Sequence, residues 1–322
     1  MPPASPPVQR ILVTGGTGFI GSHLVQRLAV DGYQVHVVHR PGSNLSRLAE
    51  AGSTVRLWPC ELSDSAGLST VLGAIRPEVI YHLAGDASLR HFDPALAGVS
   101  DSIERNLRAS MNLVVTAANA NLPELRLLVR LGGMEEYGRG PLPYDEAQRE
   151  QPVSPYSASQ VAVTYYLQML AARLSFRSVT IRPALIYGPG QAKSFFIPSL
   201  IESCLEGRDF RISTGSQGRD LLYVDDLITG LMRLLVVSVT PGEIINLGSG
   251  EEYLIKDVAA AIVRLTGSKI RLLEEGTARP GQIEHLYGSR RKAEALLGWQ
   301  PTIELESGLR RTIEAISLKK IP

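Results

Sequence analysis

The sequence lacks several features that would by themselves define a class of protein. Its 322 residues include only two cysteines, Cys60 and Cys204, whose spacing suits neither a disulfide framework nor a metal site. We therefore expect two reduced, partly buried thiols and no metal. No apolar run approaches the length needed to cross a membrane. The formal net charge is +1, which gives no electrostatic footprint for nucleic acid or an anionic membrane surface.

The first nine residues also lack the apolar core of a secretory signal. They contain four prolines, which disfavour helix and strand alike. We expect a disordered tail over residues 1–9 and a cytoplasmic protein.

From Arg10 onward, short β-branched runs alternate with segments of helical periodicity. Strands are expected over 11–14, 33–39, 55–62, 78–85, 125–133 and 178–188, and helices over 20–30, 102–120 and 156–174. This alternation predicts an α/β fold with a doubly wound parallel sheet, the Rossmann architecture, over residues 10–182. The shorter, mixed pattern after Gly188 predicts a smaller C-terminal substrate-binding lobe. We assign it mainly to 183–322, with some segments returning to the first domain.

A glycine-rich turn, TGGTGFIG, lies between the first expected strand and the first expected helix. Gly16, Gly18 and Gly21 follow the spacing that lets backbone amides approach a pyrophosphate at a helix N-terminus. The acid that usually follows about 20 residues later, to bind the ribose of NAD, is absent. His39 and Arg40 stand there instead. Arg40 could accept the extra phosphate of NADP, stack on adenine or face solvent, so these residues leave NAD and NADP open.

Further motifs follow in a fixed order. They are TGGTGFIGSHL, YHLAG, EEYG, PYSAS, RPALIYGPGQ, GRDLLYVDDL, INLGSG, RPG and LGWQP. On these motifs the chain resembles the extended short-chain dehydrogenase/reductases, in their sugar-nucleotide epimerase/dehydratase branch, from Arg10 to Pro301. The resemblance implies a bound NAD, a UDP-sugar substrate, and a homodimer formed through the helices that hold Asn106 and Tyr156. It implies no nucleic-acid or membrane partner.

The resemblance also implies roles for individual residues. Tyr156 matches the base that takes the proton of a sugar hydroxyl. Arg219 and Arg279 match arginines that hold the substrate diphosphate, although either could be a solvated surface charge. Ser88 and Tyr187 are the other expected substrate contacts. The expected cofactor contacts are Gly15, Gly18, Phe19, Ile20, Gly21, His39, Arg40, Glu61, Leu62, Leu83, Ala84, Gly85, Tyr156, Gln160, Pro183 and Ile186.

Three positions depart from the family pattern. The catalytic serine or threonine is Gly133, the lysine after the tyrosine is Gln160, and an asparagine that contacts substrate phosphate is Leu185. A lysine lowers the pKa of tyrosine, which is about 10 when unperturbed, because a nearby cation favours the phenolate. Gln160 can hydrogen-bond the cofactor ribose but supplies no charge. We therefore expect Tyr156 to be a weaker base in a site that still functions.

The segment GGMEEYG contains the remaining candidate catalytic residues. In the family's 4,6-dehydratases a glutamate here removes the proton at sugar carbon 5, and an aspartic acid protonates the departing hydroxyl on carbon 6. Here the glutamate is Glu135, whereas Met134 replaces the aspartate. One carboxylate could perform both steps in sequence, or only one of them. Alternatively, Glu135 orders the loop and Met134 fills the core.

These observations leave three hypotheses. The first is a UDP-N-acetylhexosamine 5,6-dehydratase, in which carbon 4 is oxidised, water leaves across carbons 5 and 6, and hydride returns to carbon 4. The second is a UDP-sugar 4-epimerase or 4,6-dehydratase. The third is a pseudoenzyme that binds nucleotide without turnover, since the same fold can carry either role.

Overall fold

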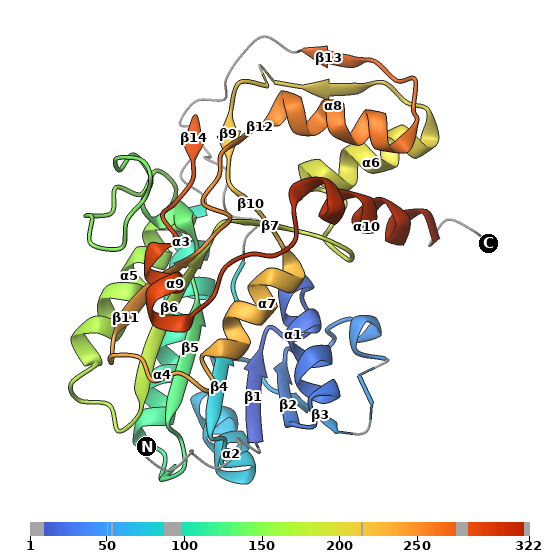
Figure 1. Ribbon diagram of the computed structural model, residues 1–322. Coiled ribbons are helices and arrows are strands. Elements are labelled where there is room, and N and C mark those ends of the chain that lie inside the picture. Colours follow the sequence, from blue (N-terminus) through green and yellow to red (C-terminus); the bar gives the residue numbers. More distant parts are fainter. Residues whose placement is uncertain are drawn as a thin grey trace.

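The computed structural model describes residues 10–49, 51–52, 54–86, 98–213, 215–274 and 283–318 (Figure 1). Within these residues a seven-stranded parallel sheet has the order β11-β6-β5-β4-β1-β2-β3. Its strands are β1 (Arg10–Thr14), β2 (Gln34–His39), β3 (Val55–Pro59), β4 (Val79–His82), β5 (Leu127–Leu131), β6 (Arg177–Pro183) and β11 (Glu243–Leu247). The chain order reverses between β1 and β4, where the carboxyl ends of parallel strands leave a crevice for a ligand.

Helices cover both faces of this sheet. One face carries α2 (Ser65–Ile75), the π-helical turn η3 (Ile103–Arg108), α4 (Ala109–Asn119) and α5 (Pro155–Leu170), and the other carries α1 (Phe19–Val30), α7 (Val224–Arg233) and α9 (Arg291–Leu297). Successive side chains of a strand point to opposite faces, so the inner strands contribute to the cores on both sides, whereas the edge strand β3 is largely exposed. In β1, for example, Leu12 joins the core under α2 and α4, whereas Ile11 and Val13 join the core under α1.

The C-terminal half builds a second layer of short elements, drawn above the central sheet in Figure 1. Its helices α6 (Phe196–Glu206), α8 (Ile255–Thr266) and α10 (Leu305–Leu318) pack against one another. Its strands form three small sheets: β7 (Leu185–Tyr187) with β10 (Leu221–Tyr223), β8 (Phe210–Ile212) with β13 (Leu272–Glu274), and β12 (Tyr253–Leu254) with β9 (Gly218–Arg219) and β14 (His285–Leu286). Short helical segments η1 (Ser46–Leu48), α3 (Gly98–Ser102) and η4 (Met134–Glu136) complete the described elements.

The predicted doubly wound parallel sheet is confirmed, but one predicted strand was wrong. The single strand expected over 178–188 is two strands in different sheets. The backbone N–H of Ala184 still donates to Leu247 of β11, whereas that of Leu185 donates to Asp220, beside β10. Pro183 has no N–H to contribute at the change of partners. The break separates β7 from the central sheet and turns it toward the second layer.

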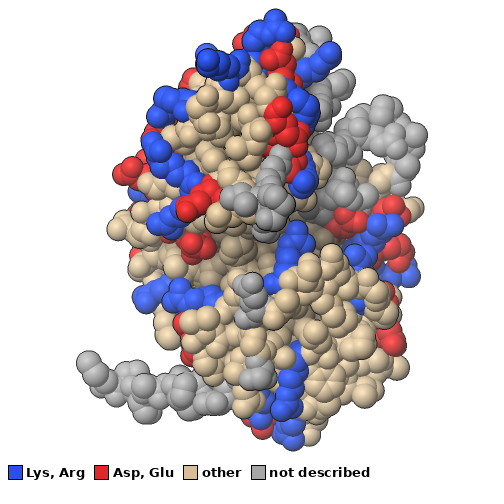
Figure 2. Space-filling view, turned by 90° about the vertical axis from the view of Figure 1, so that its right-hand side faces the viewer, with Lys and Arg blue, Asp and Glu red and all other residues tan. Residues whose placement is uncertain are grey.

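Other predictions from composition have mixed outcomes. Cys60 and Cys204 are buried free thiols, as expected. No helix in the described ranges is both long enough and apolar enough to cross a bilayer. On the face shown in Figure 2, Lys and Arg side chains lie among Asp and Glu, so no extended patch of one sign covers it. The tail over 1–9, Ser88 and Arg279 lie outside the described residues.

Candidate active site

The glycine-rich turn forms a cradle that leaves no room for side chains. Gly15 has a φ of +73°, and a Cβ there would lie 2.6 Å from the backbone N of Ala84. A Cβ at Gly21 would lie 2.1 Å from the carbonyl oxygen of Gly15. Helix α1 begins at Phe19 directly after this turn, and Gly18 caps it without a side chain. The backbone N–H groups at its start can therefore approach an anion closely, as the pyrophosphate of NAD requires.

The other candidate cofactor contacts lie along the same edge of the sheet. His39 ends β2 and the exposed Arg40 follows it, Glu61 and Leu62 follow β3, and Leu83 to Gly85 follow β4. Pro183 and Ile186 lie where the chain leaves β6, and Ile20 lies in the first turn of α1. Because parallel strands end at one edge, residues from separate parts of the sequence meet there. The fold thus brings these residues to one edge of the sheet, and their contacts with the cofactor stay a prediction.

Buried hydrogen bonds connect the β4 end to the helical face. Thr14 Oγ1 is hydrogen-bonded to His82 Nδ1 at 2.7 Å, and His82 Nε2 lies 2.8 Å from Ser110 Oγ, which donates to the carbonyl of Asn106. Burial lowers the pKa of His82 to about 3, so the imidazole is neutral. Asn106 Oδ1 then accepts from the backbone N–H of Asp86 at 2.8 Å. These bonds hold the Leu83–Gly85 segment in place.

Tyr156 and Gln160 lie one turn apart at the start of α5. Ser154 caps this helix by accepting from the backbone N–H of Ser157 at 3.1 Å, and Pro155 occupies the first helical position. Residues four apart share a helix face. Tyr156 and Gln160 are each 6% exposed, and Gln160 Nε2 lies 3.8 Å from where a Cβ on Gly85 would be. The face that carries Tyr156 therefore meets the predicted cofactor edge.

Glu135 occupies space that the glycine at position 133 leaves open. A Cβ on Gly133 would lie only 2.6 Å from Glu135 Oε2, so the carboxylate folds back over this residue. The Glu135 side chain is half-buried and interacts electrostatically with Arg219 and Tyr144. Burial raises the pKa of Tyr144 to about 12, with Arg219 opposing this rise and Glu135 adding to it. The loss of the family's hydroxyl and the position of this carboxylate are thus linked.

The adjacent Glu136 is committed to a buried ionic network. Its Oε1 accepts from Arg130 at 2.9 Å and its Oε2 from Arg182 at 2.8 Å, and Arg182 also pairs with Glu150. Burial opposes ionisation of Glu136, but the two guanidinium groups outweigh it and hold its pKa below the usual range. The family motif assigned the catalytic role to Glu135 by its position. In the structure, Glu136 belongs to this network and Glu135 lies outside it.

Two predicted site residues are core residues in the structure. Met134 is 0% exposed, and its side chain packs closely against Gly248 and Gly288. Tyr187 is 1% exposed, and its hydroxyl donates to the carbonyl of Leu305 at 3.1 Å. The side chain of Tyr187 therefore supports the start of α10 and does not face the predicted crevice. For Met134, the alternative that it fills the core describes its packing better than a direct catalytic contact.

Arg219, the predicted diphosphate ligand, is held by backbone carbonyls. Its Nη1 donates to Gly218 at 2.7 Å and to Glu284 at 2.8 Å, and its Nη2 donates to Ile283 at 2.8 Å. Burial lowers its pKa, although the negative charge of Glu135 opposes this effect. Carbonyl contacts leave the positive charge without full neutralisation, so a substrate anion could still pair with it.

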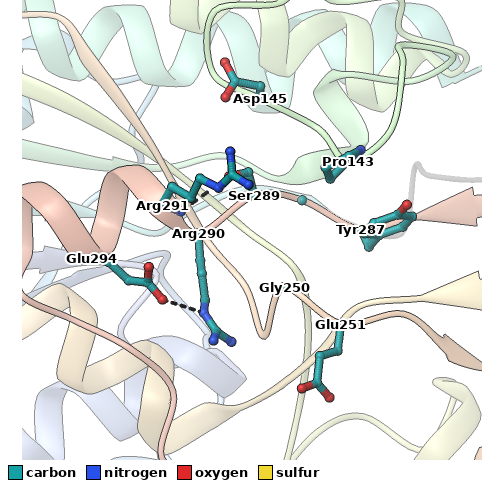
Figure 3. Close-up of a pocket in the computed structure, with 10 residues that line it drawn as sticks. Pro143, Asp145, Gly250, Glu251, Tyr287, Ser289, Arg290, Arg291 and Glu294 are labelled. Carbon is teal, nitrogen blue, oxygen red and sulfur yellow. Dashed lines mark hydrogen bonds and ion pairs between the residues drawn. The ribbon is translucent and has the colours of Figure 1, made fainter.

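A pocket of about 640 Å³ lies beside this region (Figure 3). Loops from three parts of the chain line it: Pro143 and Asp145, Gly250 and Glu251, and the segment from Tyr287 to Arg291 with Glu294. Arg290 donates to Glu294 at 2.7 Å and to the carbonyl of Ser249. Gly288 in its wall packs on Met134, so the pocket adjoins the loop that holds Glu135. In the described part of the chain, no group of three or more His, Cys, Asp and Glu side chains could hold a metal.

Sequence reasoning missed Arg130 and gave Asn106 no role at the site. Arg130 is 1% exposed and contacts Gln160 from β5. A signal for it existed, because an arginine within the apolar strand LLVRL must be buried with partners. Asn106 lies in the π-helical turn η3, which replaced the regular start of the helix expected over 102–120. Turns of this kind often occur at functional sites, but periodicity does not reveal them.

The structure combines a parallel sheet, a glycine cradle at the switch point of that sheet, and a tyrosine at the start of a neighbouring helix. These features together define a dinucleotide-dependent enzyme of the Rossmann class. The model of the NAD dependent epimerase/dehydratase family matches residues 11–248. The chain belongs to this family, and its cofactor is NAD.

Relatives and solved structures agree with this assignment. A UDP-glucose 4-epimerase of Mycolicibacterium smegmatis is 32% identical over 95% of this chain and 97% of its own length. A probable dTDP-glucose 4,6-dehydratase of Sinorhizobium fredii is 29% identical over 95% of this chain and 92% of its own. The structure of MoeE5 in complex with UDP-glucuronic acid and NAD has a TM-score of 0.86 and 28% identity, covering 96% of this chain and 99% of that one. The family therefore includes both sugar-nucleotide epimerases and dehydratases.

Proposed function

We propose that this protein is a UDP-N-acetylhexosamine 5,6-dehydratase. The observation that supports the proposal most directly is the position of Glu135. Its carboxylate lies over Gly133, the position where the family carries a hydroxyl, while Met134 replaces the second acid and is packed in the core. A site with Tyr156 and the Glu135 carboxylate suits proton transfer between neighbouring carbons of one sugar.

The proposed reaction divides the work between two side chains and the cofactor. The glycine turn before α1 would hold the pyrophosphate of NAD, which would supply reversible hydride transfer at carbon 4 of the sugar. Tyr156 takes the proton of the carbon 4 hydroxyl and gives it back at the end. Glu135 removes the proton at carbon 5, made acidic by the adjacent ketone, and transfers it to the hydroxyl on carbon 6. The carbon–oxygen bond at carbon 6 then breaks, water leaves, and a 5,6-alkene forms with no net redox change.

Arg219 would bind the diphosphate of the substrate in this proposal. Its guanidinium is already oriented by Gly218, Ile283 and Glu284. The bound UDP sugars of solved relatives are consistent with a UDP substrate. A UDP-N-acetylglucosamine 5,6-dehydratase of the kind needed in tunicamycin biosynthesis fits this pattern and would place the protein in antibiotic biosynthesis.

The experiment is incubation with UDP-N-acetylglucosamine in deuterated water, followed by mass spectrometry and NMR. We expect loss of one water, an alkene at carbons 5 and 6, and no ketone at carbon 4 of the product. Tyr156→Phe should abolish turnover, since phenylalanine cannot accept the hydroxyl proton. Glu135→Gln should still oxidise carbon 4 but should stop both deuterium exchange at carbon 5 and water loss. Dehydrated product from Glu135→Gln at the parent rate would contradict the proposal.

A UDP-sugar 4-epimerase is the second candidate, because the relative from M. smegmatis carries that name. Epimerisation needs no proton removal from carbon 5. A product of unchanged mass with inverted carbon 4 and no deuterium at carbon 5 would therefore favour it. A 4-keto-6-deoxy product would instead identify a 4,6-dehydratase, and no turnover of any UDP sugar would favour a nucleotide-binding pseudoenzyme.

A further inference from the structure

Arg130 of β5 and Gln160 of α5 form a buried contact behind the predicted cofactor edge. Arg130 Nη2 donates to the backbone carbonyl of Gln160 at 3.1 Å and also to its side-chain Oε1. Arg130 Nη1 donates to Glu136 and to Thr164, both at 2.9 Å. Arg130 is 1% exposed and Gln160 is 6% exposed. The guanidinium is therefore fixed on both sides and cannot rotate away from Gln160 without losing these bonds.

This contact determines which way the amide of Gln160 points. A guanidinium has only donors, so the amide must present its oxygen to Arg130. The opposite orientation would place the amide N–H₂ against the N–H groups of Arg130. With Oε1 facing Arg130, Nε2 faces Gly85 and lies 3.8 Å from the Cβ position of that glycine. Gly85 ends the segment after β4 that lines the predicted site of the cofactor ribose.

We infer that Arg130 is a positioning residue that holds Gln160 as a hydrogen-bond donor to the ribose next to the nicotinamide of NAD. Gln160 thus replaces the donor function of the family's lysine, and its donor N–H₂ is polarised by the cation on the other side of the amide. The inference rests on membership of the NAD-dependent family and holds for dehydration and epimerisation alike.

The charges of the network explain why a glutamine suits this position. Two cations, Arg130 and Arg182, face two anions, Glu136 and Glu150, so the buried cluster is electrically balanced. A lysine at position 160 would bring an ammonium against the guanidinium of Arg130 in a region of low dielectric, which is costly. A neutral side chain with one acceptor and one donor meets both neighbours. A charged lysine at position 160 is therefore electrostatically incompatible with the buried guanidinium of Arg130.

The test compares two ligands that differ by one ribose. ADP-ribose contains the second ribose of NAD, whereas ADP lacks it. Affinities are measured by calorimetric titration of cofactor-free protein. Gln160→Met should weaken the binding of ADP-ribose about fivefold to tenfold, the effect of one lost hydrogen bond, and should leave the affinity for ADP unchanged. Gln160→Glu keeps an oxygen for Arg130 but has no donor, so it should show the same selective loss.

Arg130→Lys tests the positioning role directly. Lysine keeps a cation beside Glu136 but lacks the planar fork that bonds Gln160. We expect a selective loss of affinity for ADP-ribose that is smaller than the loss caused by Gln160→Met. In the double variant, Arg130→Lys should add nothing to the loss caused by Gln160→Met. Equal weakening of ADP and ADP-ribose would show a general structural defect and overturn the inference, as would unchanged binding of both ligands by Gln160→Met. If Arg130→Lys fails to fold, the two Gln160 variants decide the matter.

Discussion

Replacing Gly133 by alanine should selectively damage the step that uses Glu135. The new Cβ would lie 2.6 Å from Glu135 Oε2, whereas ordinary van der Waals contact begins at 3.4 Å. The carboxylate must therefore move by about 0.8 Å, and a misplacement near 1 Å can cost roughly a hundredfold in rate. We expect proton exchange at carbon 5 and water loss to slow by about tenfold to a hundredfold. Oxidation at carbon 4, which uses Tyr156, should change much less.

The assay separates the two steps in one sample. Rapid-mixing absorbance follows oxidation at carbon 4, while NMR in deuterated water follows exchange at carbon 5. Gly73→Ala is a matched control because the same change lies in an open position within α2, where alanine favours the helix. Parent rates of carbon 5 exchange in a folded Gly133→Ala protein would refute the link between this glycine and Glu135.

Three further predictions concern stability and assembly. Glu136→Gln should lower the free energy of unfolding, measured in urea, by about 3–5 kcal/mol, because Arg130 and Arg182 lose a buried anion. The control is Glu306→Gln at an exposed position, which should change the free energy of unfolding little. The contribution of His82 to stability should fall by about 1.4 kcal/mol from pH 7.5 to 5.5, because the unfolded state takes up a proton that the buried imidazole, with a pKa of about 3, does not. His36, whose pKa is also lowered by burial, adds to the slope in the same direction. His82→Gln should flatten that slope, and an unchanged slope would contradict this assignment. Exposed apolar side chains on η3, α4 and α5 are consistent with the expected homodimer. Tyr166→Glu should therefore reduce the mass measured by light scattering to that of a monomer. If the unmutated protein is already a monomer, the expected homodimer is wrong.

Local features of the sequence were sufficient to predict the parallel sheet and the phosphate-binding turn. Strand and helix periodicities depend on residues close in the chain, and the glycines of the turn follow a fixed spacing. The same reasoning placed Tyr156 at a helix start, and in the structure Ser154 caps that helix while Pro155 occupies its first position. These predictions needed no knowledge of which segments would later touch.

Only the tertiary structure decided which neighbouring polar residues are available for chemistry. The motif selected Glu135 by its position, but only the structure shows that the arginines of β5 and β6 pair with the buried charge of Glu136. Likewise, the sequence showed that Gln160 lacks a charge but can hydrogen-bond, whereas only the structure shows that Arg130 donates to its Oε1 and so orients the amide. The partners in these contacts are 6 to 46 residues apart in sequence. The free-energy cost of an ionised side chain depends on its burial and its partners. Both are set by contacts between distant parts of the chain and therefore by the fold.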